Sequence, residues 1–191
     1  MARGSRWLAG ASYLQKWLAL GALIGAMAGT GAIVFYEALV AATHLFLGVL
    51  AGYHVPTPTG EGGHPASASF ARPWALPLVV GFGALLGAVV VFRFAPDAEG
   101  HGTDAAISAV HHNPRSIRFR TVIVKIVASA LTIGSGGSGG REGPTGQISA
   151  GFASLLAREL DLSPADARTA VATGIGSGIG PSSGRPSEAR S

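Results

Sequence analysis

Residues 17–52 read WLALGALIGAMAGTGAIVFYEALVAATHLFLGVLAG, a stretch of 36 residues in which Glu37 is the one formal charge. This stretch is too long for a signal-peptide core, which spans about 7–15 apolar residues. As a helix it would measure about 54 Å, well beyond a hydrocarbon core of about 30 Å. We therefore expect either one steeply tilted helix that emerges from the bilayer or two helices separated by a break.

Small residues recur along this stretch, and they suit close contact between membrane helices. They are Gly21, Gly25, Ala28, Gly29, Gly31 and Ala32. The ordinary glycine content of a membrane helix explains them equally well, so the sequence leaves both interpretations open.

Two further apolar segments follow. Residues 74–92 are a run of 19 residues without a charge, which is long enough to cross a bilayer. Residues 121–133 are apolar over only 13 residues and contain Lys125. Because a span needs about 20 residues, we expect this segment to form a half-helix that reaches partway or is buried inside a bundle.

The composition agrees with a membrane protein. Charged residues make up 13% of the chain, against about 25% in soluble domains, and hydrophobic residues make up 48% beside 29 glycines. The absence of cysteine excludes disulfides and thiolate chemistry. The net charge of +4 comes from scattered basic residues, so we expect no nucleic-acid partner. Lys16 and Lys125 are the two lysines beside twelve arginines, a bias that suggests a bacterial genome.

Basic residues indicate the orientation of the chain. The segment 1–16 has three of them, the loop 53–73 has one, and the segment 93–120 has four. We therefore expect the amino terminus and residues 93–120 on the cytoplasmic side and the first loop outside. His54 and His64 lie in that loop without the spacing of metal ligands, so we expect no metal site there.

The glycine-rich segment Gly134-Ser-Gly-Gly-Ser-Gly-Gly-Arg-Glu-Gly-Pro-Thr-Gly146 is suited to binding an anion. Glycines allow backbone N–H groups to converge, and a helix beginning near Pro144 would direct its free amides to the same place. Arg141 and Glu142 lie within this segment. Charges at membrane depth are functional by default, although these two can also pair for structural reasons.

A dinucleotide-binding loop is the competing interpretation of the same glycines. Gly134-x-Gly136-x-x-Gly139 matches that fingerprint, and Glu159 follows at a suitable distance. The helix would then open near Gly136 and hold Pro144 in its interior, at a cost of about 3 kcal/mol. A Walker A loop is excluded because no Gly-Lys-Ser/Thr occurs.

The residues Gly134 to Ile148 closely resemble the motif G-S-G-G-S-x-G-R-E-G-P-x-x-Q-I of the CLC family of voltage-gated chloride channels and chloride/proton exchangers. Gly100-His-Gly-Thr-Asp104 stands where the family has G-S-G-I-P-E or, in some bacterial members, G-H-G-V-P-E, so that Thr103 and Asp104 depart from the pattern. Residues 171–180 resemble a later Gly/Ala-rich helix. The resemblance covers most of this chain but less than half of the family's membrane domain.

This resemblance implies an all-α membrane protein, the amino-terminal part of an inverted-repeat helical bundle. It implies helices near 104–109 and 121–133, and others from about Pro144 and from Pro164, where Ser163 caps and Asp166 stands at the third position. It also implies chloride transport, as a channel or an antiporter, by a multi-pass protein of a bacterial plasma membrane. The family is homodimeric, and we expect the helices that form its dimer interface to be missing from this chain. No enzyme activity and no cofactor are expected.

The same resemblance implies the site residues. Glu142 is the expected gating carboxylate, which occupies an anion site when it is ionised and leaves when it is protonated. The expected anion-binding residues are His101, Arg141, Gly143, Pro144, Thr145 and Gly146. His101 stands where many members have a serine hydroxyl.

The sequence divides into a leader (1–16), a partial transmembrane domain (17–180) and a tail (181–191). The tail is polar and contains proline, unlike the helix before it. With one inserted base, suitable codons for the tail also encode A-I-F-R-A-P-L-G-G-A-V, a family-like continuation. We therefore expect a frameshifted or truncated product that is inactive in transport by itself.

Overall fold

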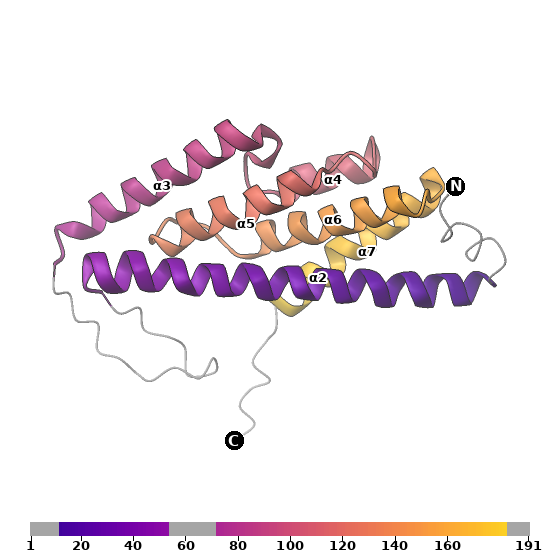
Figure 1. Ribbon diagram of the computed structural model, residues 1–191, viewed down its shortest axis with the longest axis horizontal. Coiled ribbons are helices and arrows are strands. Elements are labelled where there is room, and N and C mark those ends of the chain that lie inside the picture. Colours follow the sequence, from indigo (N-terminus) through magenta and orange to yellow (C-terminus); the bar gives the residue numbers. More distant parts are fainter. Residues whose placement is uncertain (1–11, 54–71, 183–191) are drawn as a thin grey trace, which may run out of the picture.

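The computed structural model describes residues 12–53 and 72–182, and within these ranges it consists of helices without a strand (Figure 1). The all-α prediction is confirmed. The elements are α2 (Tyr13–Thr43), the π-helical η1 (His44–Ala51), α3 (Ala75–Phe94), the 3-10 turn η3 (Pro96–Ala98), α4 (Thr103–His111), α5 (Phe119–Gly134), α6 (Glu142–Glu159) and α7 (Pro164–Ser182). The first eleven residues of the leader, the loop residues 54–71 with both loop histidines, and residues 183–191 of the tail lie outside the described part.

The first apolar stretch forms one continuous helix of 39 residues rather than two. It begins with a capping box, in which the Gln15 amide donates to Ser12 Oγ and the Gln15 side chain accepts from the Ser12 amide. At His44 the helix widens into the π-helical η1, and it ends at Gly52, whose φ is 63°. It can therefore cross a bilayer only when tilted or when it emerges from it.

One face of α2 is buried, at the regular spacing of a helix stripe. The buried residues are Leu20, Ile24, Ala28, Gly31, Phe35 and Leu39. A methyl group at Gly31 would lie 2.5 Å from Phe152 of α6, whereas Gly21, Gly25 and Gly29 have open space around them. Gly31 therefore serves a close helix contact, whereas Gly21, Gly25 and Gly29 fit the ordinary glycine content of a membrane helix.

The second span, α3, runs antiparallel to α2 and begins beside its far end (Figure 1). Its buried residues Ala75, Val79, Gly83 and Gly87 recur every fourth position. A methyl group at Gly83 would collide with Ser135 and lie 3.0 Å from the Leu131 carbonyl. The contact between α3 and α5 is thus a close approach of two backbones, as in small-residue membrane packing.

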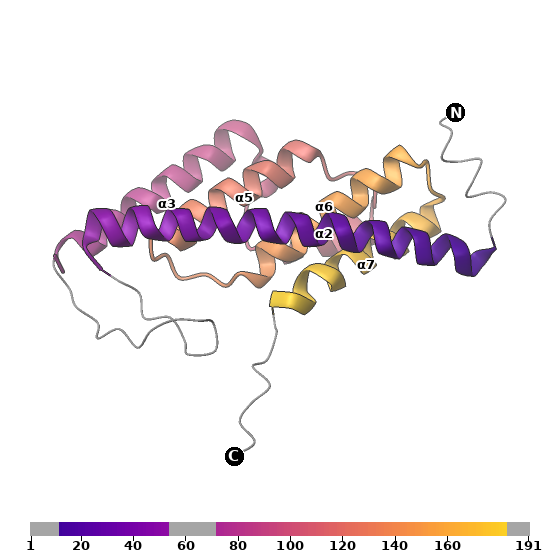
Figure 2. The same cartoon turned by 60° about the horizontal axis from the view of Figure 1, so that its bottom comes forward.

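The helices α6 and α7 form an antiparallel pair, and α2 lies across both (Figure 2). Ile148, Ala150 and Ala157 of α6 are fully buried. Gly174 and Gly178 of α7 are the points of closest approach to α6. This pair carries the start of α6, which holds most of the expected site residues.

Three ion pairs occur among the described residues: Lys16–Asp166, Arg115–Asp161 and Arg118–Asp97. The first of them joins the start of α2 to the start of α7. The predicted cap of α7 is confirmed there, because Ser163 Oγ accepts from the Asp166 amide at 3.2 Å. The hydrogen bond from Lys16 holds the pKa of Asp166 below its usual range.

Asp166→Asn is expected to destabilise the fold by about 0.5–1 kcal/mol at neutral pH, because it removes a partly exposed ion pair. A carboxylate whose pKa is lowered on folding contributes stability above its unfolded pKa of about 3.9, and that contribution disappears as the pH falls. The difference between variant and wild type should therefore close below about pH 4 in detergent unfolding curves. An equal difference at pH 7 and pH 3 would contradict this assignment.

Candidate anion site

The glycine-rich segment begins where α5 ends, and the backbone there explains its first glycines. The Gly137 amide donates to the Thr132 carbonyl and the Gly136 amide donates to the Ile133 carbonyl, both at 3.0 Å. This is the double hydrogen bond of a Schellman cap. Gly136 has a φ of 98°, which disfavours any residue with a side chain. The loop then runs from Ser135 to Arg141.

The helix α6 begins at Glu142, two residues before the expected start at Pro144. Arg141 is its N-cap, and the Thr145 amide makes the first helical hydrogen bond, to the Arg141 carbonyl at 3.1 Å. Pro144 has no amide hydrogen. The amides of Glu142 and Gly143 are therefore the first-turn donors that no helical carbonyl satisfies.

A second helix begins at the same place. Gly102 is the N-cap of α4, with a φ of 102°, and the Ala106 amide bonds to its carbonyl at 3.1 Å. A methyl group at Gly102 would lie 2.8 Å from the Gly143 carbonyl. The amino termini of α4 and α6 are thus in direct backbone contact. Each contributes free amides and the positive end of a helix dipole.

The side chains at this junction include the two that the sequence singled out. The imidazole of His101 lies over Gly143, because a methyl group there would be 2.8 Å from Cδ2 and 3.1 Å from Nε2. His101 and Glu142 are exposed, whereas Gly143, Pro144, Thr145 and Gly146 are buried. Glu142 belongs to none of the three ion pairs found among the described residues.

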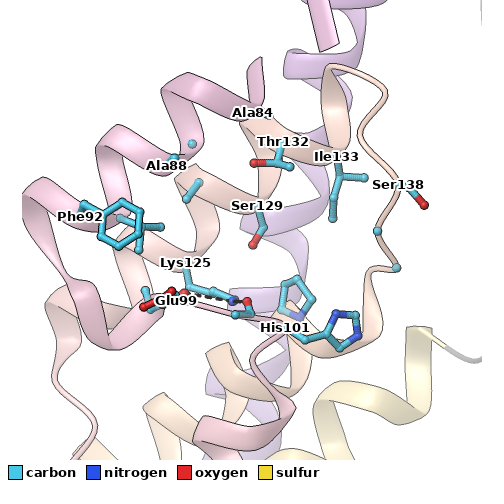
Figure 3. A pocket seen from close by; sticks show the side chains of 18 residues that line it. Ala84, Ala88, Phe92, Glu99, His101, Lys125, Ser129, Thr132, Ile133 and Ser138 are labelled. Atoms are coloured by element: carbon cyan, nitrogen blue, oxygen red, sulfur yellow. Dashed lines mark hydrogen bonds between the residues drawn. The ribbon is translucent and has the colours of Figure 1, made fainter. Parts of the chain in front are cut away.

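A cavity of about 420 Å³ lies next to this junction, between α3, α5 and the glycine-rich loop (Figure 3). His101, Glu99 and Pro144 line one side of it. Figure 3 shows Lys125 extending along the wall toward the turn that precedes α4. The cavity wall beside the glycine-rich loop therefore contains the amine of Lys125 and the hydroxyls of Ser129, Thr132 and Ser138.

Lys125 is the residue that sequence reasoning left without a role. Only 3% of its surface is exposed, and its Nζ donates to the carbonyls of Ala98 at 3.2 Å and Gly100 at 2.6 Å. These bonds fix the turn that carries His101. Its signal in the sequence was a single charge in an apolar half-helix, but its partners are backbone carbonyls, which no sequence pattern marks.

Gln147 makes a second connection to the same turn. Its Nε2 donates to the Asp97 carbonyl at 3.3 Å, while its buried Oε1 has no hydrogen-bond partner. Gln147 is one turn into α6 and reaches the segment before α4. The two helix starts are therefore held together from both α5 and α6.

The dinucleotide alternative does not fit this geometry. The segment before the glycines is the helix α5 and not a strand, and the next helix opens at Glu142 rather than at Gly136. Pro144 accordingly lies in the first turn of α6, where proline is tolerated. That interpretation of the fingerprint is wrong.

The chain is similar to a family of known membrane proteins. A family model described as voltage gated chloride channel matches residues 82–182, more than half of the chain. The H(+)/Cl(-) exchange transporter ClcA of Citrobacter koseri is 36% identical over 98 residues. The proteins of the same name from Salmonella arizonae and Salmonella paratyphi B are each 35% identical over 98 residues. Each match covers 50% of this chain and 20% of the relative, so the matched part spans about a fifth of the length of these relatives.

Proposed function

The chain belongs to the family of voltage-gated chloride channels, and from that premise we propose that it forms part of a membrane pathway for chloride or a similar small anion. The observation that supports this most is the direct contact between the amino termini of α4 and α6. This contact brings two sets of free amides and two positive dipole ends close together, which suits an anion.

Glu142 is the proposed gate of this pathway. It stands at the first position of α6, and within the described residues no cation pairs with it. An ionised carboxylate there competes with chloride for the amides of Glu142 and Gly143. Protonation removes that competition and lets the side chain leave.

His101 is proposed to contact the anion from the start of α4, together with the free Gly143 amide of α6. Pro144, Thr145 and Gly146 shape that first turn rather than donate, because Pro144 has no amide hydrogen and the Thr145 amide is bonded to the Arg141 carbonyl. The support for His101 is its position, since the imidazole lies against Gly143 and its side chain is exposed. An imidazole N–H can donate to an anion as a hydroxyl does. Arg141 adds positive charge at the N-cap position.

The setting of this pathway is also a proposal. We place the amino terminus of α2 on the cytoplasmic side of a bacterial plasma membrane, because basic residues gather at that end. The names of the relatives favour proton-coupled exchange over a channel. The family resemblance also supports a homodimer of the whole protein and a role in transport.

Glu142→Gln is the variant that tests the gate, in liposomes reconstituted with a full-length version of the protein. Glutamine is neutral at every pH, so chloride flux should lose its pH response and differ from wild type by about tenfold at neutral pH. Glu159→Gln, the same change at the exposed far end of α6, is the matched control and should behave as wild type.

Two outcomes would count against this proposal. Unchanged flux and pH response in Glu142→Gln would remove the gate assignment while leaving transport in place. Absence of chloride flux from the wild-type full-length protein would remove the transport proposal itself.

A further inference from the structure

An exposed aromatic ring close to two arginines lies at the end of the span α3. The guanidinium of Arg93 is 5.7 Å from the centre of the Phe94 ring, and that of Arg120, from the start of α5, is 5.9 Å from the same centre. Phe94 is 49% exposed, and both arginines are exposed. In the part of the chain that the structure describes, neither arginine has a carboxylate partner.

A neighbouring ion pair sets the relative position of these two arginines. Arg118, the N-cap of α5, pairs with Asp97 in η3, only three residues after Phe94. This pair joins the end of α3 to the start of α5, so that Arg93 and Arg120 meet at one ring. The charges of Arg118 and Asp97 cancel each other. Arg93 and Arg120 therefore leave two positive charges at this ring without a carboxylate partner among the described residues.

The apolar surface of α3 leads directly to this cluster. Leu85, Val89 and Arg93 are spaced by four residues and so lie along one row of the helix. Leu85 is 61% exposed, Val89 is 53% exposed and Phe92, next to Arg93, is 62% exposed. An apolar row that ends in a basic group matches a molecule with an apolar chain and an anionic head.

We propose that Arg93, Phe94 and Arg120 bind the headgroup of an anionic phospholipid, whose acyl chain lies along Val89 and Leu85. Guanidinium groups form strong charge-assisted hydrogen bonds to phosphate oxygens. Aromatic and basic residues at the end of a span mark the headgroup level of a bilayer. The apolar row favours a lipid over free phosphate, because free phosphate has no apolar part that could contact this row. This site is independent of the anion pathway and stands whether or not the protein carries chloride.

The test is native mass spectrometry of the full chain in detergent with phosphatidylglycerol and, separately, phosphatidylcholine. Wild type should retain phosphatidylglycerol and not phosphatidylcholine. The double variant Arg93→Gln/Arg120→Gln should bind phosphatidylglycerol roughly thirtyfold more weakly, since each arginine near the surface contributes about one kcal/mol. Phe94→Leu keeps both charges and should weaken binding by a smaller factor.

The matched control is Arg72→Gln/Arg168→Gln, which removes the same charge from two other exposed arginines. It should bind phosphatidylglycerol as wild type does, and equal circular dichroism of all variants will show that each is folded. Equal weakening in this control would overturn the proposal, because the effect would then be one of net charge. Unchanged binding in the Arg93/Arg120 variant, equal binding of both lipids, or displacement of the lipid by inorganic phosphate would also overturn it.

Discussion

Gly178→Val is expected to lower the free energy of unfolding by about 3 kcal/mol, the upper range for overpacking a tight helix contact. A methyl group at Gly178 would collide with the Ser149 side chain and lie 2.8 Å from the Thr145 carbonyl. A backbone carbonyl in the first turns of α6 cannot move aside without displacing that helix. The α6–α7 pair should therefore separate.

Gly176→Val is the matched control, because it makes the same substitution two residues earlier in the same helix. A methyl group at Gly176 would have no atom of another helix within 4 Å. Both changes alter helix propensity equally, so this contribution cancels in the comparison. Unfolding in detergent, followed by circular dichroism at 222 nm or by denaturant titration, measures the difference. Equal destabilisation by the two variants would mean that α7 does not face α6 as described.

Gly143→Ala is expected to reduce chloride flux of the full-length protein by tenfold or more. The added methyl group would collide with the His101 carbonyl and lie 2.8 Å from the imidazole Cδ2. Alanine is otherwise the better helix former, by about 1 kcal/mol, so any loss must come from this contact. Separating the starts of α4 and α6 removes the convergence of free amides on which the proposed site depends.

Gly140→Ala is the control for this second comparison. Gly140 belongs to the same glycine-rich segment, and a methyl group there would meet nothing within 4 Å. Flux from liposomes should remain near wild type in this variant, with unfolding curves for both variants to separate loss of function from loss of fold. If Gly143→Ala transports chloride as well as Gly140→Ala does, the contact between the two helix starts is not required.

Much of the helix order could be predicted from apolar length and capping residues. The second span and the half-helix at residues 119–134 follow from how many apolar residues each segment has. The start of α7 follows from Ser163 and Pro164, whose preferences are local. The π-helical end of α2 could not be predicted from local preference. It follows the point where Gly134 of α5 approaches Ala42 and Thr43, and its Leu47 lies beside Gly136, and both contacts join segments far apart in the sequence.

The residues of the candidate site also fall into those that local sequence predicts and those that depend on tertiary contacts. The motif placed Glu142 and its neighbours at a helix start, and the structure places that start two residues earlier than Pro144 suggested. The position of His101 beside Gly143 depends on how α4 and α6 pack, and so on tertiary contacts rather than on local preference. The role of each glycine is equally hidden from sequence: Gly174 and Gly178 touch α6, whereas Gly176 between them touches nothing.

The shortness of α5 and its buried Lys125 constrain the order in which the chain can enter a membrane during synthesis. A helix of 16 residues with a central lysine does not partition into lipid by itself, since lysine at the centre of a helix costs about 2.5–3.5 kcal/mol on insertion. The carbonyls that satisfy this lysine belong to the turn after α3, and the surface that receives the helix belongs to α3 and α2. The ribosome delivers α2 and α3 before α5 emerges, so the groups that accommodate α5 and its lysine are already synthesised when α5 enters the membrane.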